Sequence, residues 1–275
     1  MAEDQARLWR PEAFKGIVLL TARFKNFAYS RHVHEEFGIG VVEQGTQMFR
    51  CHGQTHFAAQ GAVISLNPDA IHDGRAATEA GYRYRMAYVP AEIILEALDV
   101  FPGSTRSPGY FRHPVAFDPE LSQRLLHALR LMEEHPHDLL AEQSSFIEAI
   151  VRLFTRYAEP RYVPRRFKPN PAVVRKACDL IHGRTAENLS LQEIAGEVGV
   201  SRFHFLRLFK ASTGLTPHEY LLLRRLGLAK SLIRQGHSLV RAAHEAGFAD
   251  QSHMTRRFKA AYGVTPGQYR QALLA

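Results

Sequence analysis

Two stretches near the end of the chain share one pattern: "SRFHFLRLFKASTGLTPHEY" at residues 201–220 and "DQSHMTRRFKAAYGVTPGQY" at residues 250–269. Each begins with a residue type that commonly caps a helix, Ser201 or Asp250. Each also contains a Gly, then Thr-Pro, then Glu or Gln two residues after the Pro, which predicts a helix end followed by a new capping box. We therefore expect a duplicated helical unit in this part of the chain.

A shorter helix is expected before each copy. Ser190 and Glu193 are spaced as a capping box at the start of one apolar run, and Ser238 occupies the matching position before the second copy. Gly199 and Gly247 follow these runs and suit the left-handed turn that ends a helix. Two short helices joined by a tight turn form a helix-turn-helix motif, so the repeat predicts two such motifs.

The repeat also separates inward positions from outward ones. Phe205 and Phe209 correspond to Met254 and Phe258, and apolar residues four apart in both copies are expected to face inward. Eight residues are then expected on the outward faces: Arg202, Phe203, Leu206 and Arg207 in the first copy, and Gln251, Ser252, Thr255 and Arg256 in the second. Side chains of these types can read base edges in a major groove. The residues better placed for phosphate are Lys210, Arg257 and Lys259.

The formal net charge of +8 is concentrated in the C-terminal part of the chain. From Lys168 onward there are 16 Lys and Arg against 7 Asp and Glu, whereas the preceding residues hold 19 against 20. A basic segment of this kind favours a polyanionic partner, most simply double-stranded DNA. The alternatives are that Arg207 and Arg256 belong to ordinary solvated helix faces, and that Phe203 and Leu206 belong to the core.

The segment from Pro217 to Arg234 is expected to form one helix between the two motifs. Its 18 residues correspond to about 27 Å at about 1.5 Å per residue. Successive major grooves on one side of a DNA duplex lie about 34 Å apart. A stiff helix of this length can therefore present both motifs to the same side of the duplex.

Three segments carry a resemblance to a known family: "IAGEVGVSRFHFLRLFK", "GLTPHEYLLLRRLGLAKSLI" and "AAHEAGFADQSHMTRRFKAAYGVTPGQYR". They resemble the DNA-binding domain of the AraC/XylS transcription regulators. The resemblance implies that the second helix of each motif, beginning near Ser201 and near Asp250, enters the DNA, and that the helix between the motifs is continuous. Phe203 and Leu206 depart from the more polar residues often found at those positions in the family.

The sequence pattern of the N-terminal part predicts strands followed by helices. Residues from about 16 to 90 contain short apolar runs separated by Gly, Asn, Pro and Asp, which predicts a small β-barrel or sandwich. The runs are "GIVLLTARF", "FGIGVVEQG", "TQMFRCHG", "QTHFAAQG", "GAVISLNP" and "GYRYRMAYVP". From Pro119 to Tyr157 the apolar spacing predicts two amphipathic helices. Their stripe, including Leu121, Leu125, Leu129 and Met132, is expected either to pack on the barrel or to form the dimer contact often seen in the family.

These patterns predict an α+β chain of two domains. Residues 1–160 are expected to form a cupin-like β-barrel with two following helices, for ligand sensing and dimerisation. The Pro- and Arg-rich stretch "PRYVPRRFKPNP" predicts an extended linker at residues 161–170. Residues 171–275 are expected to form an all-α, double helix-turn-helix domain that binds DNA.

The stretches "RHVHEEFGIGVVEQG" and "GAVISLNPDAIHDG" resemble the two cupin motifs, and this layout is similar to the sensing domain of AraC-type regulators. In some of those relatives a segment corresponding to "RLWRPEAFK" folds over the pocket as an arm, which is the expectation here. Because His32 and His34 are two residues apart, they share a face if they lie on a strand. The residues expected to line a ligand pocket are His32, His34, Glu36, His72, Tyr82, Tyr84 and Met86.

The chemistry of this set favours a small polar effector, such as a sugar or an amino acid. Three histidines can also hold a divalent metal ion. Metal cupins typically place a Glu four or five residues after the second His, where this chain has Gly38 and Ile39. We therefore expect no metal and no cofactor, and structural histidines without any ligand remain an alternative.

The function indicated by all these features is a ligand-responsive, sequence-specific transcription regulator without catalytic residues. It is expected to act as a homodimer on operator DNA in promoters, with RNA polymerase as a further partner. Cys51 and Cys178 suit a reducing cytoplasm, and neither a secretory signal nor a membrane span is expected. The alternatives are a metal-dependent cupin enzyme tethered to DNA-binding helices and an architectural DNA binder. A DNA-alkyl repair protein is a further class to consider, because some AraC-like domains are fused to a zinc-thiolate methyl acceptor. Such an acceptor needs a cluster of cysteines, which two cysteines cannot supply.

Overall fold

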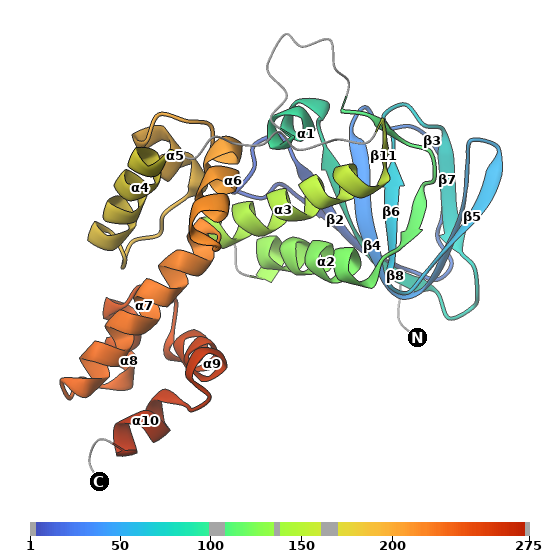
Figure 1. The fold of residues 1–275 in the computed structure, drawn as a ribbon. Coiled ribbons are helices and arrows are strands. Elements are labelled where there is room, and N and C mark those ends of the chain that lie inside the picture. The colour runs from blue at the N-terminus through green and yellow to red at the C-terminus, as the bar shows by residue number, and fades with distance from the viewer. Residues whose placement is uncertain (1–3, 99–107, 135–137, 161–169, 273–275) are drawn as a thin grey trace. The chain divides into compact units, whose positions relative to one another are not determined.

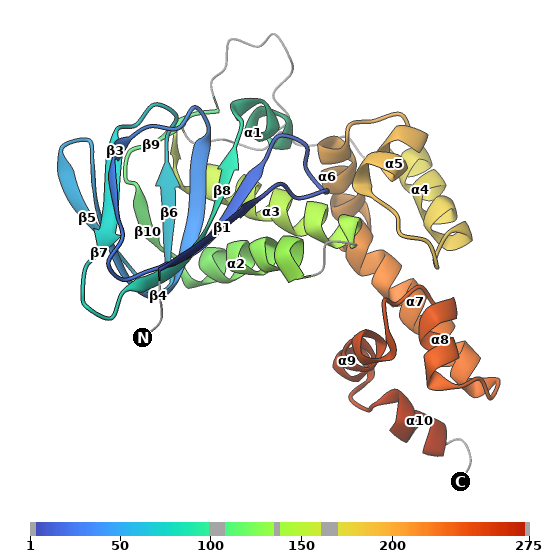
Figure 2. The same ribbon diagram turned by 180° about the vertical axis from the view of Figure 1, so that it is seen from behind.

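The computed structural model describes residues 4–98, 108–134, 138–160 and 170–272. The chain divides into two compact units, Met1–Arg166 and Phe167–Ala275, and Figures 1 and 2 draw it from opposite sides. Of the predicted linker, Asn170 alone lies among the described residues. Its side chain accepts a hydrogen bond from the backbone N–H of Val173 at 3.3 Å and thereby caps the first helix of the second unit.

Antiparallel strands form the body of the first unit. Within the described residues, a nine-stranded sheet has the order β1-β2-β8-β4-β6-β10, with β5 and β7 paired to β4 and β3 paired to β7. The strands are β1 (Gln5–Trp9), β2 (Val18–Phe24), β3 (Ala28–His32), β4 (Phe37–Cys51), β5 (Gln54–Ala59), β6 (Ala62–Leu66), β7 (His72–Ala76), β8 (Tyr82–Val89) and β10 (Val115–Phe117); β9 (Tyr110–Phe111) pairs with β11 (Ala158–Glu159). This confirms the predicted β-sheet class of the N-terminal part.

Strand β4 is longer than the sequence pattern predicted. The runs "FGIGVVEQG" and "TQMFRCHG" were expected to be separate strands, but they form one strand of 15 residues. The expected break is a bend instead, because Gly45 adopts a φ of 71° and the register with β8 shifts between Val42 and Gln44. β4 consequently pairs with β8 and β6 along its first half, and with β5 and β7 along its second half.

The N-terminal segment belongs to the sheet. Gln5 pairs with Arg23 and Trp9 pairs with Leu19 in an antiparallel register, so β1 forms an edge strand beside β2. The expectation that "RLWRPEAFK" folds over the pocket as an arm is therefore wrong for residues 7–9. An exposed strand edge offers unpaired backbone groups, and β1 satisfies those of β2 on this side.

Two long helices, α2 (Pro119–Glu134) and α3 (Leu139–Tyr157), follow the strands, and a short helix, α1 (Ala91–Ala97), precedes them. α2 packs against α3 and against β4, β6 and β8, as Figure 1 shows. The four residues of the predicted apolar stripe, Leu121, Leu125, Leu129 and Met132, are each at most 2% exposed. The stripe therefore packs within its own unit, which confirms the first of the two alternatives for it.

A buried carboxylate joins α2 to the sheet. Glu43 on β4 accepts a hydrogen bond from Arg85 Nε at 3.1 Å and from Arg130 Nη2 at 2.6 Å, and Arg83 Nε lies 2.8 Å from its other oxygen. Arg130 belongs to α2, and Arg85 on β8 also forms an ion pair with Glu133 of α2. The side chains of Glu43 and Arg85 are each 4% exposed, so their charges neutralise one another away from water.

The described residues of the second unit are helical. The helices are α4 (Pro171–Gly183), α5 (Leu191–Glu197), α6 (Arg202–Thr213), α7 (Pro217–Arg234), α8 (Leu239–Glu245), α9 (Gln251–Tyr262) and α10 (Pro266–Ala272). α5 and α6 form the first helix-turn-helix motif, and α8 and α9 form the second. α7 runs between the motifs as one helix of 18 residues, as predicted.

The predicted caps of the repeat are present. Ser201 Oγ accepts a hydrogen bond from His204 N at 3.2 Å, and Asp250 Oδ1 accepts the equivalent bond from His253 N at 2.6 Å. The predicted capping boxes pair Ser190 with Glu193, Thr216 with Glu219, and Thr265 with Gln268. Gly199 and Gly247 have φ values of 75° and 79°, the left-handed conformation predicted for both turns.

Arg225 of α7 holds the connection between α4 and α5. Its Nε donates to the carbonyl oxygen of Thr185 at 3.0 Å, and its Nη2 donates to that of Glu187 at 2.8 Å. The residue is 8% exposed, so these charge-assisted bonds lie largely out of water. They fix the start of the first motif to the helix that leads to the second.

Candidate functional site

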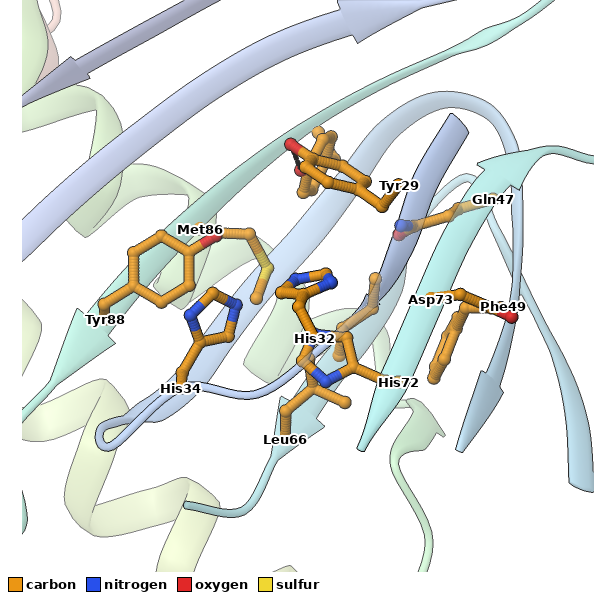
Figure 3. A pocket seen from close by; sticks show the side chains of 12 residues that line it. Tyr29, His32, His34, Gln47, Phe49, Leu66, His72, Asp73, Met86 and Tyr88 are labelled. Atoms are coloured by element: carbon orange, nitrogen blue, oxygen red, sulfur yellow. Dashed lines mark hydrogen bonds between the residues drawn. The ribbon is translucent and has the colours of Figure 1, made fainter. Parts of the chain in front are cut away.

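A cavity lies in the first unit between β3, β4, β6, β7 and β8. Figure 3 shows its lining residues: Tyr29, His32, His34, Gln47, Phe49, Ile64, Leu66, His72, Asp73, Tyr84, Met86 and Tyr88. Its free volume is about 30 Å³, which is room for one or two water molecules. A second cavity of about 410 Å³ also has His72 in its wall, together with Arg31, Arg50 and Asp69. The two cavities thus share one histidine.

Five of the seven residues predicted to line a ligand pocket lie at the first cavity: His32, His34, His72, Tyr84 and Met86. Glu36 and Tyr82 do not line it. Glu36 lies in the bend that precedes β4, where the chain turns before the strand begins. Tyr82 is 2% exposed and packs in the apolar interior of the sheet with Phe24 and Tyr84.

Sequence reasoning missed several lining residues. Tyr88 continues the alternation of Tyr82, Tyr84 and Met86 along β8, so extending that period by one step would have found it. Tyr29 lies on β3, and its hydroxyl is 2.9 Å from the hydroxyl of Tyr84. No pattern in the sequence joins Tyr29 to the site, because its position depends on the pairing of β3 with β7.

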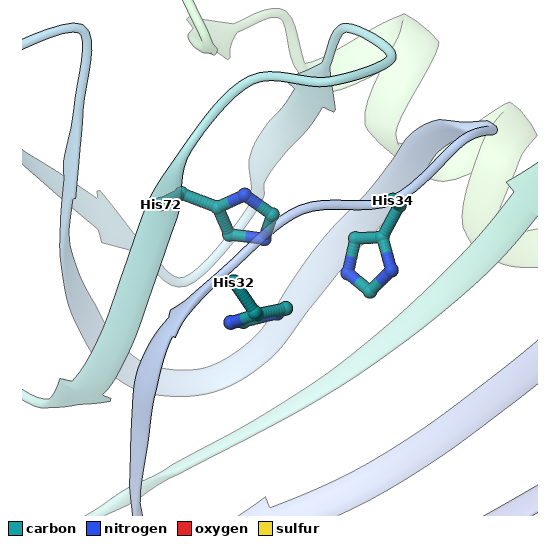
Figure 4. A group of neighbouring side chains, drawn as sticks. All are labelled: His32, His34 and His72. Carbon is teal, nitrogen blue, oxygen red and sulfur yellow. The ribbon is translucent and has the colours of Figure 1, made fainter.

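The three histidines come together as Figure 4 shows. The ring centroid of His32 lies 4.3 Å from that of His72 and 4.9 Å from that of His34, and the centroids of His34 and His72 are 5.2 Å apart. One ring nitrogen from each residue can be chosen so that all three lie within 4.8 Å of one another. His72 is 7% exposed, and His32 and His34 are half-buried.

Hydrogen bonds orient two of the imidazoles. His32 Nδ1 lies 2.8 Å from the carbonyl oxygen of Ser30, and His72 Nδ1 lies 2.7 Å from that of Ala70. A carbonyl oxygen can only accept, so both rings carry their proton on Nδ1. Burial lowers the pKa of His34 to about 4, and the neighbouring His72 and His32 contribute to this lowering. Burial also lowers the pKa of His72. His34 and His72 are therefore neutral at physiological pH.

The second helices of the two motifs carry the residues predicted to contact DNA. In α9, Gln251, Ser252 and Arg256 are exposed and Thr255 is half-buried. The predicted phosphate contact Lys259 is exposed, and Arg257 is half-buried. The outward placement predicted for the second copy is therefore seen, and its role in DNA binding stays a prediction.

In α6 the prediction is wrong at two positions. Phe203 is 1% exposed and Leu206 is 2% exposed, so neither lies on the outward face. The reason is that α6 packs against α4, α5 and α7, which bury apolar side chains on several of its sides. Arg202 and Arg207 are half-buried and Lys210 is exposed. The guanidinium of Arg202 lies over the Phe203 ring, 4.7 Å from its centre, and covers part of it.

The repeat contains a signal that sequence reasoning did not use. His204 and His253 occupy the same position in the two copies, three residues after the caps Ser201 and Asp250. Both side chains are half-buried at the start of their helices, one turn before Arg207 and Arg256. Matching the copies residue by residue, rather than selecting cations and apolar groups, would have shown this equivalence.

Comparisons with known proteins agree with this division of the chain. Residues 14–150 match the AraC-like ligand binding domain, and residues 194–272 match a helix-turn-helix domain. The chain is 30% identical over 241 residues to the uncharacterized HTH-type transcriptional regulator YbfI of Bacillus subtilis (strain 168), covering 88% of this chain and 84% of YbfI. It is 25% identical over 264 residues to the HTH-type transcriptional activator RhaS of Enterobacter sp. (strain 638), covering 92% of each. The crystal structure of ToxT from Vibrio cholerae O395 aligns with 94% of this chain and 99% of that chain, at 14% identity and a TM-score of 0.39.

The two matched domains define a DNA-binding transcription regulator with an N-terminal ligand-binding domain. The chain belongs to the AraC/XylS family, as the match to the AraC-like ligand binding domain and the relationship to the regulator YbfI along most of both chains together show. In the described ranges, no helix combines the length and the apolar character needed to cross a membrane.

Proposed function

We propose that this protein is a ligand-responsive, sequence-specific transcription regulator that has no enzymatic activity. The observation that carries the proposal is the presence, in one chain, of a lined cavity in the barrel and of two capped helices bearing Arg207 and Arg256 at matching positions. The barrel is the sensor, and the double helix-turn-helix unit is the DNA-binding domain. The predicted boundaries are kept: residues 1–160 for the sensor, 161–170 for the linker and 171–275 for the DNA-binding domain.

The effector is a small polar molecule of the sugar or amino-acid class. Imidazole, phenol, amide and carboxylate groups line the two cavities that share His72, and the larger one has the volume typical of a small-molecule site. The inner cavity holds no more than one or two water molecules, so an effector that enters it must displace side chains such as Met86 or Tyr88. A ligand that favours one arrangement of the barrel shifts the population of that arrangement.

DNA reading rests mainly on the second motif. Gln251, Ser252, Thr255 and Arg256 supply the amide, hydroxyl and guanidinium groups that discriminate base edges. In the first motif Arg202 and Arg207 have this role without Phe203 and Leu206. Lys210, Arg257 and Lys259 contact phosphates. The protein acts as a homodimer in the cytoplasm on promoter operators, where RNA polymerase is a further partner.

Selection of DNA sequences by the purified full-length chain, followed by binding measurements at fixed salt, tests the proposal. We expect enrichment of a defined site with at least about a thousandfold preference over random DNA. Equal affinity for all sequences would identify an architectural DNA binder instead. A thermal-shift screen of sugars, amino acids and aromatic acids then tests the sensor, because a ligand of the native state raises its melting temperature.

A fragment that begins at residue 166 tests the domain boundary. It is expected to fold and to bind the selected DNA, because α4 to α10 pack among themselves. An unfolded fragment would contradict the boundary without affecting the assignment of DNA binding to the full chain.

A further inference from the structure

We propose that His32, His34 and His72 form a binding site for one divalent transition-metal ion of the zinc class. The site goes beyond the proposed function and does not require it. The glutamate that metal cupins place four or five residues after the second His is absent, because this chain has Gly38 and Ile39 there. The site therefore consists of three imidazoles and one open position. Three protein ligands with an open fourth position form an established zinc arrangement.

The fold itself brings the three side chains together. β3 and β7 are antiparallel, and His32 pairs directly with His72 across them. Directly opposed residues of two antiparallel strands have their Cβ atoms about 4.5–5.5 Å apart on one face. His34 lies two residues beyond His32, in the connection that leads to β4. The meeting of His32 and His72 therefore follows from strand register, and His34 joins them from the adjoining connection.

The tautomers suit metal binding. Because His32 and His72 donate from Nδ1 to the backbone carbonyls of Ser30 and Ala70, the lone pair of each ring is on Nε2. Metal-binding histidines characteristically donate their other ring N–H to a carbonyl or a carboxylate in this way. Among the described residues, neither Nε2 has a hydrogen-bond partner in the structure. Both Nε2 atoms can therefore bind an ion without loss of these two hydrogen bonds.

The dimensions also fit an ion. Two nitrogens bound to one zinc ion at about 2.0–2.1 Å lie about 3.3 Å apart in a tetrahedral site. The present separation of up to 4.8 Å requires a movement of about 1.5 Å, and His34 can supply it because it lies between two strands and not within one. A free volume of about 30 Å³ accommodates an ion and its fourth ligand without displacement of other side chains.

The donor set selects the class of metal. Imidazole suits zinc, copper, iron and nickel, whereas magnesium and calcium prefer carboxylate and carbonyl oxygens. The carboxylate of Asp73 lines the cavity, but its Oδ1 accepts a hydrogen bond from the backbone N–H of Arg50 at 2.7 Å. The open position is available to water or to an oxygen atom of a polar effector.

Titration of the full-length protein with Co²⁺ tests the site, after removal of bound metal by a chelator and dialysis. We expect one Co²⁺ per chain, visible-region absorption of a four- or five-coordinate ion, and its displacement by one equivalent of Zn²⁺. Loss of a residue that only hydrogen-bonds a metal ligand weakens metal binding by up to roughly 100-fold. His34→Ala removes a ligand itself, so we expect it to weaken Co²⁺ binding by at least that factor. His113→Ala, at an exposed histidine of the same unit, is the matched control and is expected to leave binding unchanged.

Circular dichroism and thermal unfolding of the metal-free variants separate loss of ligand from loss of fold. His72 is buried, so His34→Ala, at a half-buried position, is the decisive variant. Binding of less than one equivalent by the wild type, or equal binding by His34→Ala, would overturn the site. A protein that selects DNA sequences but takes up no metal would overturn it and leave the proposed function intact.

Discussion

Gly247 lies directly against Ala186: a Cβ atom on Gly247 would come within 2.7 Å of the carbonyl oxygen of Ala186. Gly247 forms the turn of the second helix-turn-helix motif, whereas Ala186 belongs to the connection that precedes the first. Arg225 donates hydrogen bonds to the carbonyls on either side of Ala186. The two motifs are therefore held together by one short segment as well as by the length of α7, and this contact helps to set the spacing of α6 and α9.

Replacement of Gly247 by alanine tests this contact, and Gly199→Ala is its matched control. Both glycines adopt the left-handed backbone conformation, so replacing either with alanine introduces about 1–2 kcal/mol of backbone strain. No atom lies within 4 Å of a Cβ on Gly199, whereas one on Gly247 meets three backbone atoms of Ala186. We expect Gly247→Ala to lose a further 1–3 kcal/mol, roughly the effect of overpacking, in urea unfolding, and to bind operator DNA more weakly. Equal losses in the two variants would show that the contact with Ala186 has no energetic role.

Arg256→Ala distinguishes base reading from phosphate contact. If Arg256 reads a base, the variant loses about 1–3 kcal/mol on the preferred sequence and discriminates less at that position. Lys259→Ala is expected to weaken binding to all sequences alike. It is also expected to reduce the slope of the logarithm of the binding constant against the logarithm of salt concentration by about 1. Fluorescence anisotropy on matched and mismatched duplexes at several salt concentrations measures both effects. A uniform loss for Arg256→Ala would make that residue a phosphate contact.

Glu142 of α3 makes the stability of the protein depend on pH. Its side chain is completely buried, neither carboxylate oxygen has a hydrogen-bond partner within the described ranges, and burial raises its pKa from 4.5 to about 8. Between these values the unfolded chain releases a proton that the folded chain retains. The free energy of unfolding therefore falls as the pH rises, by at most about 5 kcal/mol at pH 8.

Glu142→Gln removes this titration while keeping the shape of the side chain. The variant is expected to be more stable than the wild type at pH 8, and the difference is expected to shrink steadily toward pH 5. Thermal unfolding of both proteins across this range measures the difference in stability. The contributions of all other titrating groups are the same in both proteins and therefore cancel. A difference that does not change with pH would contradict the raised pKa.

Removal of the Glu43 carboxylate is expected to destabilise the first unit strongly. Glu43→Ala leaves the buried guanidinium of Arg85 without one of its three carboxylate partners, and breaking a buried pair in this way costs about 3–5 kcal/mol. Arg130→Ala removes a side chain that is 47% exposed, and we expect a loss of only about 1 kcal/mol. Chemical denaturation of the two variants tests the order of these effects, which equal losses would contradict.

Some parts of the site were accessible from the sequence because their signals are local. Tyr84 and Met86 alternate along one strand, so periodicity was enough to place them together. His34 also lines the cavity, but it lies in the connection after β3, where the strand period used to predict it does not apply. Tyr29, Gln47 and Phe49 were missed because they reach the cavity through pairing between strands. Glu36 was wrongly included because residues two apart share a face within a strand, and β4 begins after Glu36.

The sequence by itself determined the duplicated motif, its caps and the continuous helix between the copies. Those features depend on interactions between residues three or four apart, which remain the same wherever the helix packs. Only the tertiary structure decided that Phe203 and Leu206 are buried, that His32 faces His72 and that Gly247 lies against Ala186. Each of these depends on which distant segment packs against the residue, and neither local periodicity nor residue type specifies that neighbour.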